Sequence, residues 1–263
     1  MIGFIGLGNM ASAIIGGIYN KKVVTSAELI GADRSEAMRN NCHDLYGMAV
    51  YEDNKEVAAK ADILFLAVKP GVLPIVIEEI KDVVREKTVI VSIVAGKSME
   101  FIEECFGRKV KLVRCMPNTP ALVQEGCTAY VQGEMVSDAE ITEVKKLLSS
   151  FGMAKEVPEH MMDAVVGISG SSPAYVFMFI EAMADAAVCA GMPRAQAYEM
   201  AAQAVMGSAK MVLETGKHPG ELKDMVCSPG GTTIEAVKVL EEMGFRAAIM
   251  DAIDACIEKS RNL

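Results

Sequence analysis

Short apolar runs rich in β-branched residues alternate with helical patterns through the first half of the chain. Ile63–Val68 and Val89–Val94 are continuously apolar, which is typical of strands covered on both faces. Further strands are predicted at Ile2–Ile5, Leu29–Ala32 and Lys111–Cys115, with helices at Met10–Tyr19, Glu36–Tyr46, Val72–Val84 and Met99–Phe106. This alternation predicts an α/β domain of the Rossmann type, doubly wound around a mainly parallel sheet with right-handed crossovers.

The pattern changes after Val157-Pro158. From Met161 onward no run reads convincingly as a strand. Helical stretches separated by Gly, Pro and Ser-Pro follow one another at about 173–191, 194–215, 219–227, 232–243 and 246–260. The sequence therefore predicts a Rossmann domain over residues 1–157, followed by an all-helical domain over residues 158–263.

The predicted helical domain is unusually poor in charge. Residues 160–213 carry six charged side chains: Asp163, Glu181, Asp185, Arg194, Glu199 and Lys210. Helices so apolar need cover, so we expect a homodimer with Ala164–Met192 buried at its interface. A membrane span over Ala164–Met192 is disfavoured, because two carboxylates lie four residues apart inside it and Gly170 and Pro173 interrupt its start.

Composition excludes several classes of protein. The chain is 51% apolar and 23% charged, an ordinary globular mixture. Its net charge of −9, with no run of Lys or Arg, argues against a nucleic-acid partner. Its seven cysteines form an odd set without C-x-x-C spacing, so neither a metal site nor a disulfide framework is predicted. The N-terminus runs straight into a strand, without a basic leader, and a cytoplasmic location is expected.

A glycine-rich segment opens the first predicted helix directly after the first strand. Its two glycines permit a tight turn and close approach to a pyrophosphate, while the helix N-terminus supplies N–H groups. Alanine at the third position suits the close packing of helix on sheet. The predicted cofactor residues here are Gly6, Leu7, Gly8, Asn9, Met10 and Ala11.

The second strand ends at Asp33, Arg34 and Ser35. An acidic residue at this point usually binds the adenosine ribose of NAD, whereas Arg and Ser favour the 2′-phosphate of NADP. Arg34 could also be a solvated loop residue capped by Asp33. The sequence favours NADP(H), with NAD(H) as the alternative.

Two further loops follow buried strands at the edge where doubly wound sheets bind ligands. Backbone groups there could hold the second ribose and the nicotinamide, although Lys69 reads equally well as a surface lysine. The cofactor residues predicted in these loops are Ala67, Val68, Lys69 and Pro70, then Ile93, Val94 and Ala95.

Four more segments have residue patterns that packing of the fold alone would not require. They are Met116-Pro117-Asn118-Thr119-Pro120, Ser169-Gly170-Ser171-Ser172-Pro173-Ala174-Tyr175, Leu222-Lys223-Asp224 and Ser228-Pro229-Gly230-Gly231-Thr232-Thr233. With the N-terminal GLGNMA and AVKP motifs, they resemble the pattern of the pyrroline-5-carboxylate reductase family in order and spacing. The resemblance runs essentially end to end.

The resemblance implies helical domains interlocked in a homodimer, with larger rings of dimers known in the family. It implies reduction of L-1-pyrroline-5-carboxylate to L-proline, the last step of proline biosynthesis, by NADPH or NADH. It assigns Asn54 to the adenosine side of the cofactor and brings Asn118 near the nicotinamide. The substrate residues it implies are Ser171, Ser172, Ser228, Gly231, Thr232 and Thr233.

Three positions depart from the family pattern. Ser172 replaces a glycine, Val166 stands where threonine is usual, and Met225 occupies a place where animal enzymes carry asparagine. The first two bear on the nicotinamide end of the site, and the third weakens any side-chain contact at position 225. None lies in the SPGGTT segment.

The residues of that segment support the same chemistry by themselves. Ser228, Thr232 and Thr233 precede the apolar run Ile234–Leu240, so free N–H groups of a first helical turn could bind a carboxylate. Pro229, Gly230 and Gly231 let the backbone close around such a ligand. A plain Ser/Thr N-cap after a turn is the alternative interpretation.

The distribution of bases also bears on the reaction. Hydroxy-acid dehydrogenases of this layout commonly use a helix lysine as base, but no Lys lies between Glu156 and Ala209. A cyclic imine can arrive already protonated, so a positioned hydroxyl such as that of Thr233 is sufficient. The sequence thus favours imine reduction over oxidation of an alcohol. A non-catalytic dinucleotide sensor is the other alternative, disfavoured because it would not need SPGGTT or MPNTP.

Overall fold

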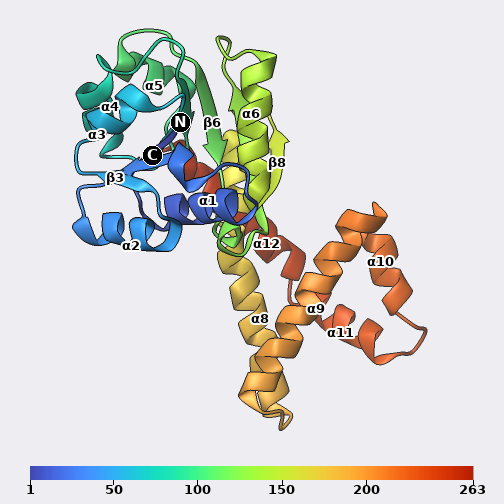
Figure 1. Ribbon diagram of the computed structural model, residues 1–263. Helices are drawn as coiled ribbons and strands as arrows, with labels where there is room; N and C mark the ends of the chain where they lie inside the picture. Colours follow the sequence, from blue (N-terminus) through green and yellow to red (C-terminus); the bar gives the residue numbers. More distant parts are fainter. Residues whose placement is uncertain (263) are drawn as a thin grey trace. The chain divides into compact units, whose positions relative to one another are not determined.

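The computed structural model describes residues 1–262, which divide into two compact units (Figure 1). The first unit comprises Met1–Ser171 together with the residues from Cys256 onward. The second unit is Ser172–Ala255. The first unit's main segment ends at Ser171, downstream of the domain boundary predicted between residues 157 and 158. That domain boundary stays a prediction.

The first unit is built on an eight-stranded sheet of order β3-β2-β1-β4-β5-β6-β7-β8. Every neighbouring pair is parallel except β6 and β7, which pair antiparallel. The strand order reverses between β1 and β4, and open α/β sheets bind ligands at such a point. The strands are β1 Ile2–Ile5, β2 Leu29–Ala32, β3 Ala49–Tyr51, β4 Ile63–Leu66, β5 Val89–Ser92, β6 Leu112–Met116, β7 Gly126–Gln132 and β8 Gly152–Glu156.

Helices cover both faces of this sheet. Alternate side chains of each central strand point to opposite faces, so Phe4 and Phe65 stack on one face while Ile5 and Leu66 pack on the other. The Phe4 face is covered by α1 Asn9–Asn20, α2 Glu36–Tyr46 and α6 Asp138–Leu148. The opposite face is covered by α3 Asn54–Lys60, α4 Leu73–Ile80 and α5 Met99–Phe106. Single turns of 3-10 helix lie at η1 Ser26–Glu28, η2 Thr119–Val123 and η3 Ser149–Phe151.

The predicted fold class is confirmed, and most predicted elements differ from the observed ones only at their ends. The apolar runs overestimate the lengths of β4 and β5 by two residues each, because the last two residues of each run lie in the loop after the strand. Strands β3, β7 and β8 and helices α3 and α6 were not predicted. β3 and β8 are the two edges of the sheet, and the sequences of β7 and β8, GCTAYVQ and GMAKE, include glycines and polar residues.

The second unit consists of helices and short connections, as predicted. Its helices are α8 Ser172–Cys189, α9 Arg194–Thr215, α10 Pro219–Val226, α11 Thr232–Glu242 and the start of α12 Phe245–Arg261. The last part of the first unit's main segment forms η4 Glu159–Met161, α7 Met162–Val165 and a π turn over Val166–Gly170, labelled η5. Among the described residues from 161 onward there is no strand.

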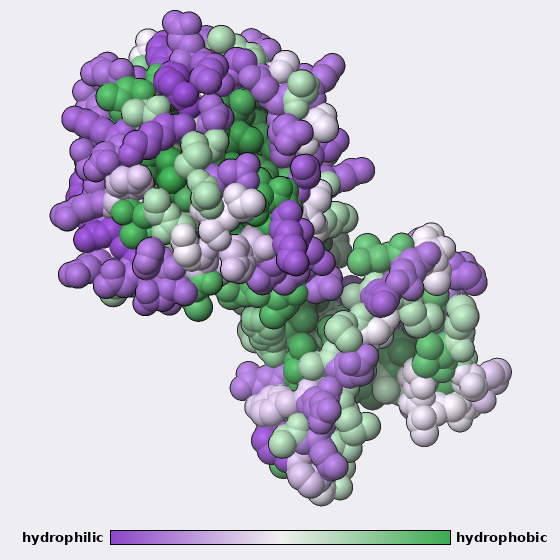
Figure 2. All heavy atoms as spheres, in the orientation of Figure 1, coloured by the Kyte–Doolittle hydropathy of each residue, from purple (hydrophilic) through white to green (hydrophobic). Residues whose placement is uncertain are grey.

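The helical unit has little core of its own. Within residues 172–255, all of which are described, the buried residues are Ala184, Ala197 and Ala201. Large apolar side chains are instead exposed, including Phe177 at 62%, Leu213 at 77% and Met243 at 79%. Figure 2 shows apolar residues gathered on the visible faces of these helices. Such a surface requires cover from outside the chain.

The helical run Glu159–Cys189 is long and apolar enough to cross a membrane by length and composition alone. Only 11% of its most apolar window is buried within the chain. One carboxylate on this run, Asp185, forms an ion pair with Arg194 of α9. The run contains three further carboxylates, Glu159, Asp163 and Glu181, so it is not uniformly apolar.

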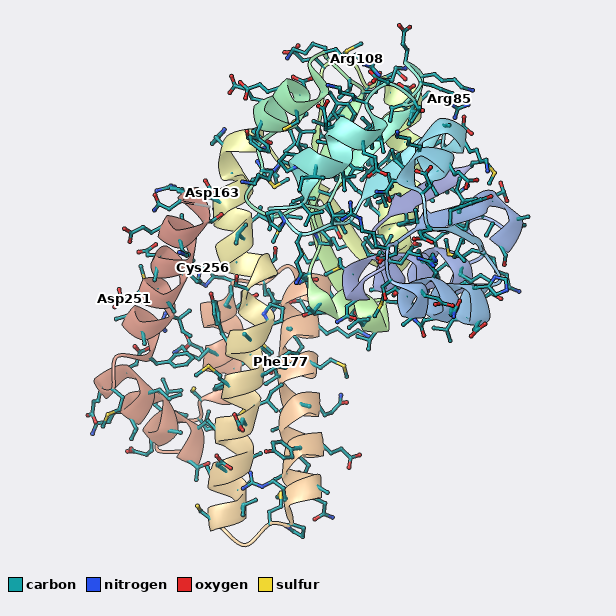
Figure 3. All side chains as sticks on the ribbon, turned by 90° about the vertical axis from the view of Figure 1, so that its left-hand side faces the viewer. Arg85, Arg108, Asp163, Phe177, Asp251 and Cys256 are labelled. Atoms are coloured by element: carbon teal, nitrogen blue, oxygen red, sulfur yellow. The ribbon has the colours of Figure 1, made fainter. Side chains whose placement is uncertain are left out.

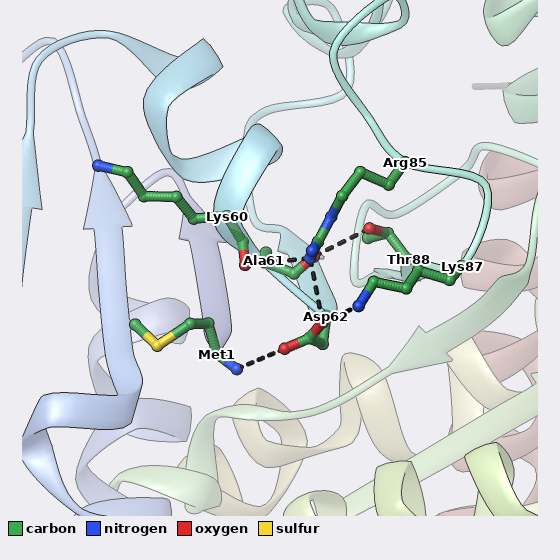
Figure 4. Close-up of polar contacts among 7 residues, drawn as sticks. All are labelled: Met1, Lys60, Ala61, Asp62, Arg85, Lys87 and Thr88. Carbon is green, nitrogen blue, oxygen red and sulfur yellow. Dashed lines mark hydrogen bonds and ion pairs between the residues drawn. The ribbon is translucent and has the colours of Figure 1, made fainter.

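A charge cluster fixes the edge of the sheet where β1, β4 and β5 begin (Figure 4). The Asp62 carboxylate accepts hydrogen bonds from the Met1 amino group at 2.8 Å and from Arg85 at 3.0 Å, and it pairs with Lys87 at 3.3 Å. Arg85 and the Thr88 hydroxyl also donate to the Ala61 carbonyl. The amino group bonded to Asp62 lowers the pKa of that carboxyl to about 2. The cluster lies at the edge opposite to the carboxyl ends of the strands.

Replacing Asp62 should therefore cost stability in a pH-dependent way. A carboxyl whose folded pKa is depressed stabilises the fold above its unfolded pKa and loses this contribution as the pH falls through the folded value. Since Asp62 is 52% exposed, we expect Asp62→Asn to lower the free energy of unfolding by no more than about 1 kcal/mol at pH 7. Urea unfolding should show the difference shrinking below about pH 4. Asp82→Asn, at an exposed carboxylate without an ion pair among the described residues, is the control. A difference that grows on acidification would contradict the assignment.

Candidate functional site

A cavity of about 270 Å³ opens at the carboxyl ends of β1, β2 and β4, at the reversal of strand order. It brings together eight of the residues predicted from the sequence, contributed by four separate loops. Its lining consists of Ile5, Gly6, Gly8, Asp33, Arg34, Asn54, Ala67, Val68, Lys69, Val72 and Val76. Every one of these residues belongs to the first unit.

The glycine turn is shaped by close contact with β4. Gly6 has a φ of +90°, and a Cβ added there would lie 2.5 Å from the Ala67 carbonyl oxygen. A side chain at position 6 is therefore excluded by both strain and space. At Gly8, by contrast, an added Cβ would meet nothing within 4 Å, so the missing side chain leaves open space beside the cavity.

Helix α1 begins directly behind this turn. Gly8 is its N-cap and supplies no side-chain cap, and the first turn holds no acidic residue. The first N–H groups of a helix have no acceptor within it. The N–H groups of Asn9, Met10 and Ala11 and the positive end of the helix dipole are consequently suited to a phosphate.

The Asp33 carboxylate is committed to the protein backbone. One of its oxygens accepts the Leu7 N–H at 2.8 Å, and the other accepts the Ser35 N–H at 2.8 Å. These bonds link the glycine turn to the loop after β2. Sequence reasoning assigned Asp33 to the cofactor, and the structure adds this bracing role.

Two positively charged side chains at the cavity have no ion-pair or hydrogen-bond partner for the charged group among the described residues. Arg34 and Lys69 are exposed and form no ion pair or side-chain hydrogen bond among the described residues. Arg39 differs, because its guanidinium donates to the carbonyls of Asp33 at 2.7 Å and Arg34 at 3.1 Å. It thereby holds the loop that presents Arg34.

Asn54 and two valines complete the cavity. Asn54, only 6% exposed, is the first residue of α3 and donates to Glu79 at 2.9 Å. Val72 and Val76 were not predicted as site residues. Their spacing of four on the helix that follows AVKP is the signal that could have identified them, because it places both on one helical face.

Several predicted cofactor residues adjoin the cavity without lining it. They are Leu7, Asn9, Met10 and Ala11 of the glycine turn and α1, Ser35, Pro70, and the Ile93-Val94-Ala95 loop. The Ile93 N–H donates to the Leu66 carbonyl, so this loop continues from β5 beside the end of β4. These residues stay predictions.

Asn118 lies away from the cavity and is occupied by internal bonds. Its side chain, 7% exposed, donates from Nδ2 to the Ser169 carbonyl at 3.0 Å, and its Oδ1 accepts the Cys127 N–H at 2.7 Å. The predicted proximity of Asn118 to the nicotinamide therefore stays a prediction, with no cavity contact behind it. Ser171, also in the first unit, accepts a hydrogen bond on its hydroxyl from the Cys256 thiol at 3.1 Å.

The Ser228–Thr233 segment begins α11 in the second unit. Gly231 is the N-cap and provides no side-chain cap, and Gly230 has a φ of +67°. Thr232 and Thr233 are the first two residues inside the helix, so the alternative of a plain Ser/Thr N-cap does not hold. The first-turn N–H groups are free of a side-chain cap, and Thr233 is half-buried.

Neither a metal centre nor a histidine dyad accompanies these features. Across residues 1–262 no group of three or more His, Cys, Asp or Glu could hold a metal ion. His43 lies against the Met48 carbonyl, and His218 caps α10 by accepting the Gly220 N–H. Burial raises the pKa of the Cys115 and Cys127 thiols, so neither is a ready nucleophile.

Two family models match two separate parts of the chain. The model described as pyrroline-5-carboxylate reductase dimerisation matches residues 159–263. The model described as NADP oxidoreductase, coenzyme F420-dependent, matches residues 1–96. The first covers the helical region, and the second covers the strands and loops that form the cavity.

Full-length relatives agree with these matches. A pyrroline-5-carboxylate reductase of Escherichia coli is 53% identical over 262 residues, which cover 100% of this chain and 97% of the relative. The solved structure of a pyrroline-5-carboxylate reductase from Coxiella burnetii is 33% identical and superposes with a TM-score of 0.93, covering 99% of this chain and 97% of that one. The Plasmodium falciparum enzyme, solved with NADP bound, is 34% identical with a TM-score of 0.90, and the match covers 99% and 97% of the two chains. The chain therefore belongs to the pyrroline-5-carboxylate reductase family.

Proposed function

We propose that this protein reduces L-1-pyrroline-5-carboxylate to L-proline with NADPH, the last step of proline biosynthesis. The observation that carries the proposal is the cavity at the reversal of strand order, with its glycine turn and unpaired cations, in a chain of this family. Consumption of NADPH on addition of L-1-pyrroline-5-carboxylate, with L-proline as product, tests it directly. Absence of substrate-dependent consumption would refute it.

The residues of the cavity suit a dinucleotide. Gly6 and Gly8 let the backbone approach a pyrophosphate, whose charge faces the N-terminus of α1. Asn54, Val72 and Val76 line the part of the cavity beyond that turn. When bound, the nicotinamide cofactor supplies a hydride.

The charge distribution favours NADPH over NADH. Both oxygens of Asp33 are engaged by backbone N–H groups, so this carboxylate is less available to a ribose 2′-hydroxyl. Arg34 is exposed without a protein partner and can form a charge-assisted hydrogen bond to a 2′-phosphate. Arg39 holds the loop in place beneath it.

The start of α11 suits the substrate carboxylate. Its first-turn N–H groups have no side-chain cap, and Gly230 and Gly231 allow a ligand to approach the backbone. We assign carboxylate binding to Ser228, Gly231, Thr232 and Thr233, with Ser171 and Ser172 as further substrate contacts. In this proposal the Thr233 hydroxyl oxygen accepts a hydrogen bond from the protonated ring nitrogen.

The proposed reaction needs no strong protein base. A protonated imine carries its own proton, and the protein's task is to align the electrophilic carbon and stabilise the nitrogen. None of His43, His160 and His218 lines the cavity. The absence of Lys between Glu156 and Ala209 argues against alcohol oxidation in the same site.

The exposed apolar helices support a homodimer rather than a membrane span. The matched family model is named for dimerisation, and the carboxylates Glu181 and Asp185 would be costly in lipid. In this proposal the helical units of two copies interlock and cover one another, and rings of dimers are compatible with it. The proposed enzyme is cytoplasmic. The net charge of −9, without a run of Lys or Arg, argues against a nucleic-acid partner.

The dimer proposal predicts the mass of the protein in solution. We expect light scattering at micromolar concentration to give at least twice the 28.2 kDa of one chain, because one chain leaves the apolar faces of α8 and α9 uncovered. Phe177→Glu, at a 62% exposed position, should weaken the assembly. A compact monomer of the unaltered chain would contradict the proposal.

Replacing Arg34 should separate the two cofactors. Loss of a charge-assisted contact of about 1.5–3 kcal/mol predicts that Arg34→Ala raises the NADPH KM roughly ten- to hundredfold. The NADH kinetics should be nearly unchanged and serve as the internal control. Arg34→Lys should retain part of the preference. Equal losses with both cofactors would instead indicate a ribose pocket around Asp33 that does not discriminate.

Replacing Thr233 tests the proposed hydrogen bond between its hydroxyl and the ring nitrogen. Thr233→Ala keeps the backbone amides but removes the hydroxyl, so kcat/KM should fall by about 10–100-fold for the loss of one transition-state hydrogen bond of roughly 1.5–3 kcal/mol. Thr233→Ser returns the oxygen and should restore most of the activity. Unchanged turnover in Thr233→Ala would remove the hydroxyl from the mechanism while leaving carboxylate binding by the amides intact.

A further inference from the structure

The segment Met162–Ser171 is held by hydrogen bonds from two sides. It contains α7 and the π turn, which ends where the Ser171 N–H donates to the Val166 carbonyl at 2.8 Å, five residues earlier. Such widened turns occur often at functional sites, and they need support because their own hydrogen bonding is less favourable than that of an α-helix. The support here comes from elements distant in the sequence.

On one side the support is Asn118, which follows β6. Both ends of its amide are used, since Nδ2 donates to the Ser169 carbonyl and Oδ1 accepts the Cys127 N–H. Asn118 thus links the MPNTP loop, the start of β7 and the π turn, and within that turn the Ser169 hydroxyl donates to the Val165 carbonyl at 3.1 Å. A buried amide held at both ends, with one of its two Nδ2 N–H groups on the Ser169 carbonyl, is fixed in one orientation.

On the other side the support is the last part of α12. The Ser260 hydroxyl, 7% exposed, donates to Asp163 at 2.8 Å, and Arg261 lies 3.8 Å from the same carboxylate. These contacts place Cys256 so that its thiol donates to the Ser171 hydroxyl at 3.1 Å. Figure 3 labels Cys256 and Asp163 on these two elements. The hydroxyl of Ser171 is therefore oriented by a neighbour outside its own segment.

We infer that Asn118 is a positioning residue that acts through Ser171, fixing the π turn from one side while Cys256 orients the Ser171 hydroxyl from the other. This inference rests on the proposed function, in which Ser171 contacts the imine substrate. In this inference Asn118 acts on the substrate through Ser171 and not by direct contact. The MPNTP loop also packs against α1 through η2, so one loop supports both the cofactor helix and the substrate serine.

Asn118→Asp tests the support of the π turn by Asn118 with little change in the shape of the side chain. The carboxylate can still accept the Cys127 N–H, but it has no donor for the Ser169 carbonyl and places negative charge against it. We expect the KM for L-1-pyrroline-5-carboxylate to rise about three- to tenfold, the order expected for one lost hydrogen bond. The NADPH dissociation constant, measured by fluorescence titration, should stay within about twofold, because no cofactor contact is lost. Asn20→Asp, at an exposed asparagine at the end of α1, controls for the added charge.

A double-mutant cycle with Ser171→Ala distinguishes action through Ser171 from a general effect on stability. In the Ser171→Ala background, Asn118→Asp should add less than about a twofold change in the substrate KM, because residues that act through one another are non-additive. Cys256→Ala leaves the Asn118 contacts intact and should raise the same KM about two- to threefold, also without addition to Ser171→Ala. This arm tests the Cys256 side of the inference independently of Asn118.

Three results would overturn the inference. They are weaker NADPH binding by Asn118→Asp with an unchanged substrate KM, full additivity with Ser171→Ala, and unchanged kinetics in Cys256→Ala. An unaltered enzyme that does not consume NADPH with L-1-pyrroline-5-carboxylate would instead refute the proposed function, before any variant is compared.

Discussion

The close approach of the Gly6 turn to the Ala67 carbonyl is the contact on which the candidate cofactor site depends. A Cβ at position 6 would lie 2.5 Å from that oxygen, so the ends of β1 and β4 can be this close only with glycine in the turn. Their proximity sets the start of α1 at the reversal of strand order. It also brings the loops after β2 and β4 to the same edge, where Arg34 and Lys69 present unpaired positive charge.

The helical unit, unlike the sheet, has almost no core within one chain. Its interior within one chain amounts to three buried alanines, while residues such as Phe177 and Met243 are exposed to solvent. The hydrophobic effect that stabilises the sheet within one chain is, in this half, available only through contact with another surface. Proposed dimer formation is thus a condition for the stability of the helices.

Buried or half-buried polar side chains in this protein serve the fold at the same positions where a ligand would be expected. Asp33 satisfies two backbone N–H groups and so joins the glycine turn to the loop after β2. Asn118 satisfies one carbonyl and one N–H group and joins three loops. Unmet hydrogen-bonding groups are costly away from water, so such residues are needed even when they do not touch a ligand.

The sequence by itself determined the fold class, the helical second half and the family, because periodicity and short motifs are local properties. It also pointed to eight residues that line the cavity: seven lie in a glycine turn after a strand and in loops at strand ends, and Asn54 came from the family resemblance. The tertiary structure decided the rest. Strands β7 and β8 carry too weak an apolar pattern to be predicted from their local sequence. Val72 and Val76 became cavity residues only once α4 was placed on the sheet. Whether an amide such as that of Asn118 faces a ligand or a neighbouring loop depends on which distant carbonyl lies 3.0 Å away, and no local pattern records that distance.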